Sequence, residues 1–159
     1  MQLLKQLTDE ALKKMMFELY NKIINSNKKM ASSTKFIDFF VHDILDYTML
    51  NKNESKFDKH ITIFNVKDSV NEIIETLDDK TQMKDIEIDT KYVGFENNNL
   101  NIQTDQKRMQ QILLNLYSNA IKFTDRFGKV VIIVEKVRKN LSQDLLIISV
   151  IDSGIGIKY

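Results

Sequence analysis

Three polar residues at helical spacing are the first candidates for chemistry in this sequence. Asn115, Asn119 and Lys122 follow one another in steps of four and three, so on a helix they share one face. Amide oxygens can ligate Mg²⁺, and a lysine ammonium can bind a phosphate oxygen. On spacing alone, the alternative of an ordinary solvated helix face stays open.

A second candidate is the segment DSGIGI, which begins at Asp152 and contains Gly154 and Gly156. It follows a nearly apolar run that is typical of a buried strand. A carboxylate there can accept a hydrogen bond from an exocyclic amine, and glycines let the backbone approach a ligand closely. By itself, the segment is equally consistent with an ordinary glycine-rich turn.

The spacing of apolar residues predicts the elements that position these candidates. A helix is expected over 105–124, capped by Thr104 or Asp105, with one buried face made of Met109, Ile112, Leu113, Leu116, Ala120 and Ile121. A helix is also expected over 66–77. Strands are expected at 61–65, 86–92, 100–103, 130–137 and 145–151, the last two as a hairpin around a turn at 139–144. The last strand is nearly all apolar and is expected to be central in its sheet.

The N-terminal third predicts one long helix, because no glycine or proline interrupts it. A seam with steps of four and three runs over 12–47: Leu12, Met16, Leu19, Ile23, Ser26, Met30, Ser33, Ile37, Phe40, Ile44 and Tyr47. Such a heptad pattern favours a coiled coil or helical bundle. Only seven residues precede Thr8, where the helix is expected to begin. A second copy of the chain, or sequence missing upstream, is therefore expected to supply the partner helix.

Composition excludes several function classes. The 159 residues carry a net charge of +1, which gives no reason to expect nucleic acid or an anionic membrane as a partner. There is no cysteine, and His42 and His60 are the only histidines, so thiolate and histidine-rich metal sites are excluded. No apolar run is long enough for a membrane segment in this chain, and a cytoplasmic location is expected, with membrane attachment of the parent protein left open.

Taken together, four segments resemble the sensor histidine kinases. QILLNLYSNAIKFT is similar to that family's N box, and VIDSGIGI is similar to its G1 box. FVHDILDYTML resembles the end of the second helix of the dimerisation and phosphotransfer domain. FNVKDSVNEIIETL followed by KDIEI resembles the entry into the ATP-binding domain. The resemblance covers roughly residues 19–157 and implies an α+β fold: a dimerisation helix remnant at 1–50, a linker at 51–65 and an incomplete ATP-binding domain at 66–159.

The resemblance also implies roles for the candidates, with ATP and Mg²⁺ as cofactors. Asn119 would coordinate Mg²⁺, and Asn115 would line the same site one turn earlier. Lys122 would contact the nucleotide phosphates, and Asp152 would accept the adenine amino group. Gly154 and Gly156 would make room for the adenine ring.

Two departures from the family pattern suggest that this chain is inactive alone. The phosphoacceptor histidine of the family lies in a segment like HEFRTP, and no histidine precedes His42 here, so no catalytic residue is assigned. The family's later glycine boxes are also missing. The parent protein is expected to transfer phosphate from ATP to its own histidine and then to a response-regulator receiver domain.

Two other interpretations stay open. The chain could be a non-catalytic module that forms a homodimer through the 12–47 seam. It could also belong to the wider group of gyrase and mismatch-repair ATPases, but there a glutamate usually stands where this sequence has Asn115. An incomplete sheet would leave Val131, Ile133, Leu146 and Ile148 partly uncovered, and poor solubility is expected.

Overall fold

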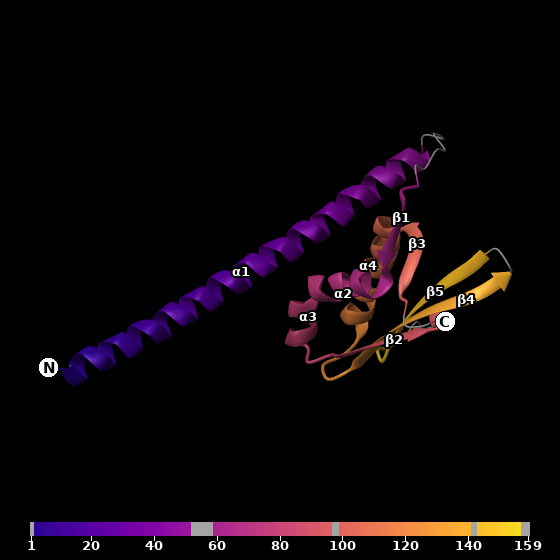
Figure 1. Cartoon of the computed structure of the whole chain (residues 1–159). Coiled ribbons are helices and arrows are strands. Elements are labelled where there is room, and N and C mark those ends of the chain that lie inside the picture. Colours follow the sequence, from indigo (N-terminus) through magenta and orange to yellow (C-terminus); the bar gives the residue numbers. More distant parts are fainter. Residues whose placement is uncertain (1, 52–58, 97–98, 141–142, 157–159) are drawn as a thin grey trace. The chain divides into compact units, whose positions relative to one another are not determined.

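The computed structural model describes residues 2–51, 59–96, 99–140 and 143–156. Contacts divide the chain into two units, residues 1–44 and 45–159, which are described separately. The first consists of most of helix α1 (Gln2–Asn51), and the second contains the other helices and all the strands (Figure 1).

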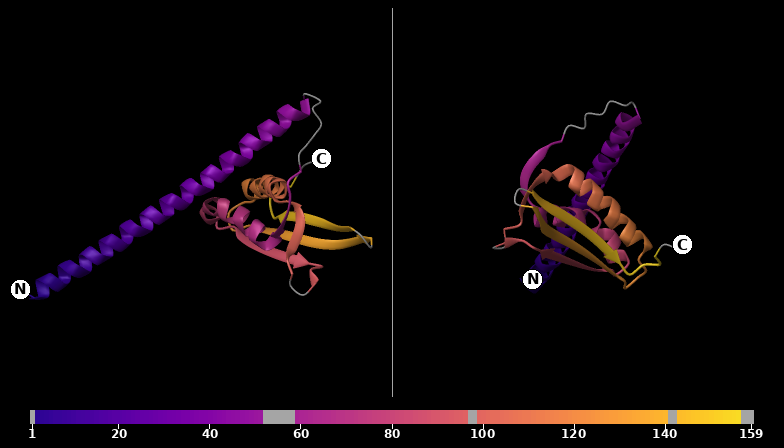
Figure 2. Two further views of the ribbon diagram at one scale, coloured as in Figure 1. Left: turned by 45° about the horizontal axis from the view of Figure 1, so that its top comes forward. Right: turned by 90° about the vertical axis from the view of Figure 1, so that its right-hand side faces the viewer.

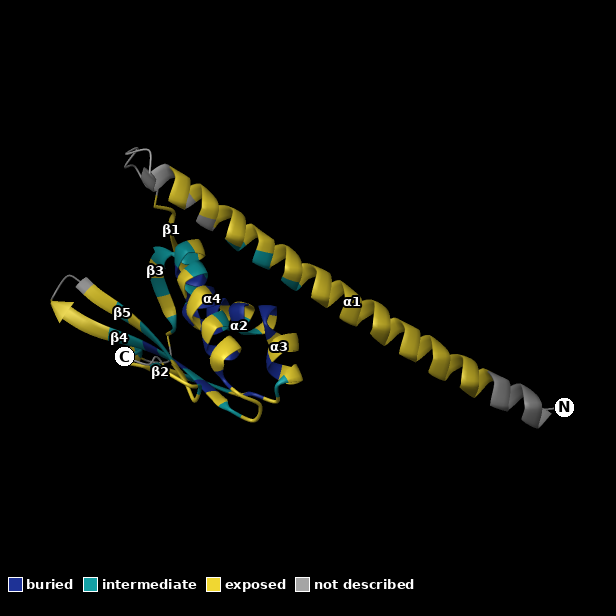
Figure 3. Cartoon of the chain, turned by 180° about the vertical axis from the view of Figure 1, so that it is seen from behind, coloured by how far each residue is buried: buried dark blue, intermediate teal, exposed yellow. Residues whose placement is uncertain are grey.

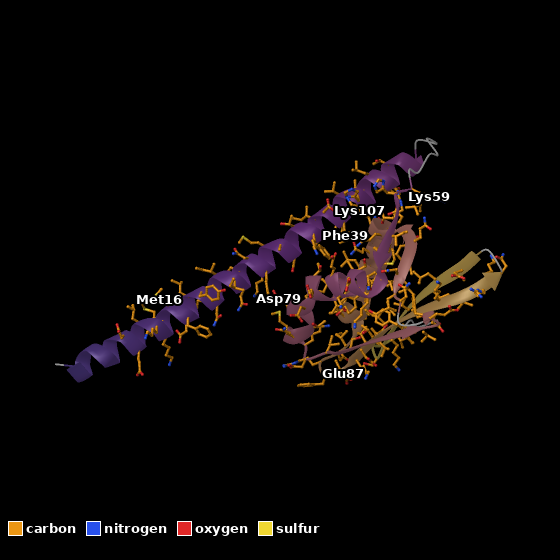
Figure 4. The ribbon with its side chains drawn as sticks, in the orientation of Figure 1. Met16, Phe39, Lys59, Asp79, Glu87 and Lys107 are labelled. Carbon is orange, nitrogen blue, oxygen red and sulfur yellow. The ribbon has the colours of Figure 1, made fainter. Side chains whose placement is uncertain are left out.

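Helix α1 runs without a break for 50 residues, as the absence of glycine and proline predicts, but it begins at Gln2 and not at Thr8 as expected. Its nine apolar seam residues, from Leu12 to Tyr47, are between 49% and 66% exposed. In Figure 3 the helix is coloured as exposed over almost all of its described length, and Figure 4 shows side chains standing out around it, with Met16 labelled. A long helix whose apolar side is uncovered gains little stability from packing within its own chain.

The second unit contains both strands and helices. In chain order it contains β1 (Ile61–Asn65), α2 (Val66–Thr76), α3 (Asp78–Met83), β2 (Glu87–Val93), β3 (Asn101–Asp105), α4 (Gln106–Phe123), β4 (Lys129–Asn140) and β5 (Gln143–Asp152). β1 pairs antiparallel with β3. A second sheet has the order β2-β4-β5, with β2 parallel and β5 antiparallel to β4. The helices α2, α3 and α4 lie on one face of this second sheet (Figure 2).

The core lies between this sheet and its helices. On β4 the alternate residues Val130, Ile132 and Val134 are fully buried, as expected for one face of a strand. The helices contribute Val66, Val70 and Ile73 from α2 and Leu113, Tyr117 and Ile121 from α4. The α+β fold predicted from the sequence is therefore correct. The packing of the helices on the sheet determines which side of α4 faces inward.

Several details differ from the sequence-based expectations. Ile112 and Leu116 are 62% and 44% exposed, whereas Leu114 and Tyr117 are buried in their place. The apolar face of α4 is wider than the layer beneath it, so only part of that face is covered. β5 is an edge strand of the described sheet, and β4 is the central one. The hairpin is tighter than predicted, because pairing continues to Asn140 and Gln143. Residues 141 and 142 of the predicted turn lie outside the described residues.

Candidate functional site

Helix α4 is fixed at its first turn by Asp105, one of the two predicted caps. The Asp105 carboxylate accepts hydrogen bonds from the backbone N–H of Arg108 (3.2 Å) and of His60 (2.9 Å). Burial raises the pKa of Asp105, but these two hydrogen bonds and the nearby Arg108 charge outweigh that effect and lower it overall. The cap therefore joins α4 to the chain that enters β1.

Asn115, Asn119 and Lys122 share the exposed side of α4, opposite the buried Leu113 and Tyr117. The spacing of four and three residues brings them into one stripe along the helix, as the sequence predicts. The Lys122 ammonium lies 5.0 Å from the centre of the Phe123 ring. The stripe is thus open to a ligand and does not contribute to the core.

Asp152 ends β5 on the same side of the sheet as α4. It pairs with Val130, and residues directly opposite in an antiparallel pair share a face. Val130 is fully buried, so its face is the one that the helices cover. One oxygen of Asp152, Oδ1, accepts a hydrogen bond from the Gly154 N–H at 2.8 Å, and the side chain remains exposed. The carboxylate is therefore partly oriented by the loop that follows it.

The loop after Asp152 lies against the C-terminal end of α4. A Cβ placed on Gly154 would lie 2.5 Å from the Phe123 carbonyl oxygen, so the two backbones are in direct contact. Asn119 is four residues before Phe123, which is about one helical turn of 5.4 Å. The structure therefore brings the polar stripe of α4 and the end of β5 to one region of the molecule.

Ser153 ties this loop to the start of β4. Its backbone N–H donates to the Lys129 carbonyl at 3.0 Å, and its Oγ accepts from the Lys129 N–H at 2.9 Å. Further along, Gly156 has a φ of 67°, and no atom lies within 4 Å of the position that a Cβ would take there. Gly154 is thus required for close packing, whereas Gly156 is required only for a left-handed backbone.

Lys84 holds the C-terminal end of α4 in place. Its ammonium donates hydrogen bonds to the carbonyl oxygens of Ile121 (2.9 Å), Lys122 (3.0 Å) and Thr124 (2.9 Å). The last carbonyls of a helix have no partner within the helix, and a cation suits them electrostatically. Sequence patterns give no sign of this role, because Lys84 is 37 to 40 residues from the groups it binds.

Other features of the described residues do not add to this region. Among the residues that the structure describes, no three histidine or acidic side chains are close enough together to hold a metal ion. A hollow lined by residues such as Ile63, Gln103 and Leu145 lies between β3 and the far end of the β4–β5 hairpin. None of the six predicted site residues lines it. The candidate site is therefore the open corner between α4 and the end of β5.

Comparisons with known proteins identify the relatives of this chain. Residues 104–159 match the family described as histidine kinase-, DNA gyrase B- and HSP90-like ATPases. The chain is 31% identical over 128 residues to the non-motile and phage-resistance protein of Caulobacter vibrioides, which covers 79% of this chain and 14% of that protein. It is also 31% identical over 119 residues to the circadian input-output histidine kinase CikA of Synechococcus elongatus, with 74% and 14% covered.

Solved structures of histidine kinases also resemble this chain. The catalytic domain of the histidine kinase ThkA superposes with a TM-score of 0.53 at 27% identity, over 62% of each chain. The chain belongs to the histidine kinase family. It is a piece of a sensor histidine kinase with part of the ATPase domain, and it spans about a seventh of the length of the two curated relatives above.

The segment predicted to be the N box forms most of α4, and the segment predicted to be the G1 box forms the end of β5 and the loop that follows. The two segments meet where Gly154 contacts Phe123. Across the described residues, no helix has the length and apolar character needed to cross a membrane.

Proposed function

We propose that the second unit binds ATP at the corner between α4 and the end of β5. The observation that carries this proposal is the contact between Gly154 and the last turn of α4, because it puts the stripe beside the strand-end carboxylate. Asp152 accepts a hydrogen bond from the adenine amino group, and Gly154 and Gly156 leave room for the ring. Lys122 binds phosphate oxygens, and its exposed position on α4 suits a flexible anion contact.

A magnesium ion fits this donor set only together with the nucleotide. Asn119 offers one neutral amide oxygen and Asn115 a second one turn earlier, both on the outer side of α4. Mg²⁺ usually keeps several waters and binds through a few protein oxygens plus substrate phosphates. The ion would neutralise charge on the phosphates, and the two asparagines would orient it. No binding of Mg²⁺ without nucleotide is expected.

At the level of the whole protein, we propose a phosphorelay kinase that phosphorylates a histidine and passes the phosphate to a response-regulator receiver domain. A crystal structure of ThkA in complex with the response regulator TrrA aligns with 79% of this chain at 25% identity and a TM-score of 0.56. The 159-residue chain is expected not to phosphorylate itself, because neither His42 nor His60 stands in a segment similar to the acceptor motif. The cytoplasmic location also stays a prediction.

Titration calorimetry with the full chain tests nucleotide binding. Wild type is expected to bind ATP in a Mg²⁺-dependent way. Asp152→Asn is expected to weaken binding by about tenfold or more, since a hydrogen bond to a charged group contributes roughly 1.5–3 kcal/mol. Its carbonyl oxygen can still accept from Gly154, so the loop should keep its conformation. Asp79→Asn, an exposed change on α3, is the matched control.

Two results would contradict the proposal. The first is the absence of ATP and ADP binding at millimolar protein. The second is equal loss of affinity in Asp152→Asn and in the Asp79→Asn control. Asn119→Ala separates the metal role, because it should remove the Mg²⁺ dependence while leaving adenosine binding unchanged.

The exposed seam of α1 favours a second function, association of two copies of the chain. Its nine apolar residues are each at least 49% exposed, which is a large apolar surface for a helix in water. Sedimentation should show a dimer for wild type and a monomer for Leu19→Asp and Ile37→Asp. Asn21→Asp, which places the same side chain outside the seam, should remain dimeric. A wild-type chain that sediments as a monomer would end this proposal.

A further inference from the structure

The proposed phosphate contact lies at the electrostatically unfavourable end of helix α4. Lys122 belongs to the last turn of this helix, which ends at Phe123. The backbone carbonyls at the C-terminal end of a helix carry a partial negative charge, equivalent to about half an elementary charge. They repel a bound polyphosphate, whereas the N-terminal end of a helix attracts one. Positive charge close to these carbonyls would offset the repulsion.

Lys84 brings such a charge to the carbonyls of this turn. Its ammonium lies 2.9 Å from the Ile121 oxygen, 3.0 Å from the Lys122 oxygen and 2.9 Å from the Thr124 oxygen. The Ala120 carbonyl accepts from the Thr124 N–H at 3.0 Å and so has a backbone partner. Lys84 is only partly exposed, and a partly buried charge is screened less by salt than an exposed one.

The same geometry leaves Lys84 no donor for a direct contact with phosphate. A lysine ammonium has three N–H donors and no acceptor, and three carbonyl oxygens already occupy them. Lys84 also lies outside residues 104–159, which match the ATPase family. Any effect of Lys84 on a ligand must therefore pass through α4, which makes it a positioning residue.

We infer that Lys84 makes the C-terminal end of α4 compatible with a polyphosphate and so favours ATP over adenosine, an inference that rests on the ATP binding proposed above. Its charge offsets the carbonyls of the turn from which Lys122 reaches the phosphates. Electrostatic energy scales with the charge of the ligand, so the contribution of Lys84 rises from adenosine through ADP to ATP. A purely structural role in holding the turn would affect all three ligands alike.

Calorimetric titration of the full chain with ATP, ADP and adenosine in the same Mg²⁺ buffer measures this dependence on charge. Lys84→Gln removes the charge, but its side-chain amide keeps two N–H donors for the carbonyls. ATP affinity is expected to fall about fivefold, the usual size of a charge effect at a helix terminus, and adenosine affinity by less than about twofold. Lys84→Arg keeps the charge and should retain the wild-type ratio of ATP to adenosine affinity. Lys91→Gln, an exposed change on β2, alters the net charge equally and should also leave this ratio unchanged.

Equal loss of ATP and adenosine affinity in Lys84→Gln would overturn the inference, because a structural role alone gives that result. An unchanged ratio in Lys84→Gln, or the same change of ratio in Lys91→Gln, would overturn it as well. Lys84→Met supplies a second neutral side chain if the melting curve shows that Lys84→Gln is unfolded. A wild-type chain that binds none of the three ligands overturns the ATP-binding proposal and this inference together.

Discussion

Individual residues decide the contact on which the proposed site depends. Gly154 has the Phe123 carbonyl oxygen 2.5 Å and the Asp152 Oδ1 2.7 Å from the position of a Cβ atom. Backbone atoms cannot move aside as a flexible side chain can. The second glycine of the same motif, Gly156, has open space around it. The two glycines of one motif therefore have different physical reasons for being glycine.

Gly154→Ala is expected to separate the loop from α4 and to lower the free energy of unfolding by roughly 1–3 kcal/mol, the usual cost of an inserted methyl group. Thermal unfolding measures the stability, and amide chemical shifts of Phe123 and Thr124 report the movement. Gly156→Ala should cost about 1–2 kcal/mol from its left-handed backbone and leave the Phe123 shift unchanged. Wild-type shifts and melting temperature in Gly154→Ala would contradict the contact.

At the scale of elements, α4 is held at both ends by groups distant in sequence. Asp105 caps the first turn and binds the chain before β1, and Lys84 binds the carbonyls of the last turn. The stripe of asparagines and Lys122 lies between these anchors. A helix fixed at both ends presents its exposed side chains in a defined direction, which a ligand site requires.

The Asp105 cap makes part of the stability depend on pH. The pKa of Asp105 is lowered in the folded chain, so its contribution is fully present above the unfolded value of about 3.9. That contribution is lost as pH falls through the lower folded value. Asp105→Asn is expected to be less stable than wild type at pH 7, and the difference should shrink below about pH 4. Denaturant unfolding at several pH values measures this, and a difference that is constant with pH would contradict it.

Lys84→Met is expected to loosen the C-terminal turn of α4. Methionine keeps most of the apolar stem but removes the donor for three carbonyl oxygens, at a cost of about 1–3 kcal/mol. Hydrogen exchange of the Thr124 amide, which donates to the Ala120 carbonyl, should become faster. Lys91→Met, an exposed lysine of β2, is the control that should leave this exchange rate as in wild type.

At the scale of the whole molecule, apolar surface is left uncovered in both units. In the second unit the helices cover one face of the β2-β4-β5 sheet, and Ile147 and Ile151 on the other face are 37% and 53% exposed. The four strand residues predicted to be partly uncovered, Val131, Ile133, Leu146 and Ile148, are all intermediate in exposure. An open edge strand with apolar side chains is a site for association.

Ile151→Lys is expected to reduce aggregation of the purified chain, because a charge on an edge strand disfavours pairing with another edge. Light scattering at increasing protein concentration measures this effect. Met83→Lys adds the same charge and removes an exposed apolar residue at the end of α3, 80% exposed, so it should have much less effect. Equal improvement in both variants would indicate that net charge, and not the edge of β5, controls solubility.

Much of this protein follows from its sequence alone. The absence of helix breakers determines α1, and alternating or three-and-four spacing determines the strands and α4, because each depends on neighbours close in the chain. The polar stripe of α4 and the DSGIGI segment are recognised as candidates by residue type and spacing for the same reason, and their roles are implied by the resemblance to the histidine kinases. The buried face of α4 is only partly predicted: Ile112 and Leu116 fit the helical period, but the layer beneath does not reach them.

Only the tertiary structure decided which of these local patterns meet. The contact of Gly154 with Phe123, the three carbonyls bound by Lys84 and the edge position of β5 each join segments far apart in sequence. Local propensity carries no information on such pairings, because they depend on how the helices pack on the sheet. For α1 the sequence predicts the apolar seam, and the surface proposed to cover it belongs to a second copy of the chain.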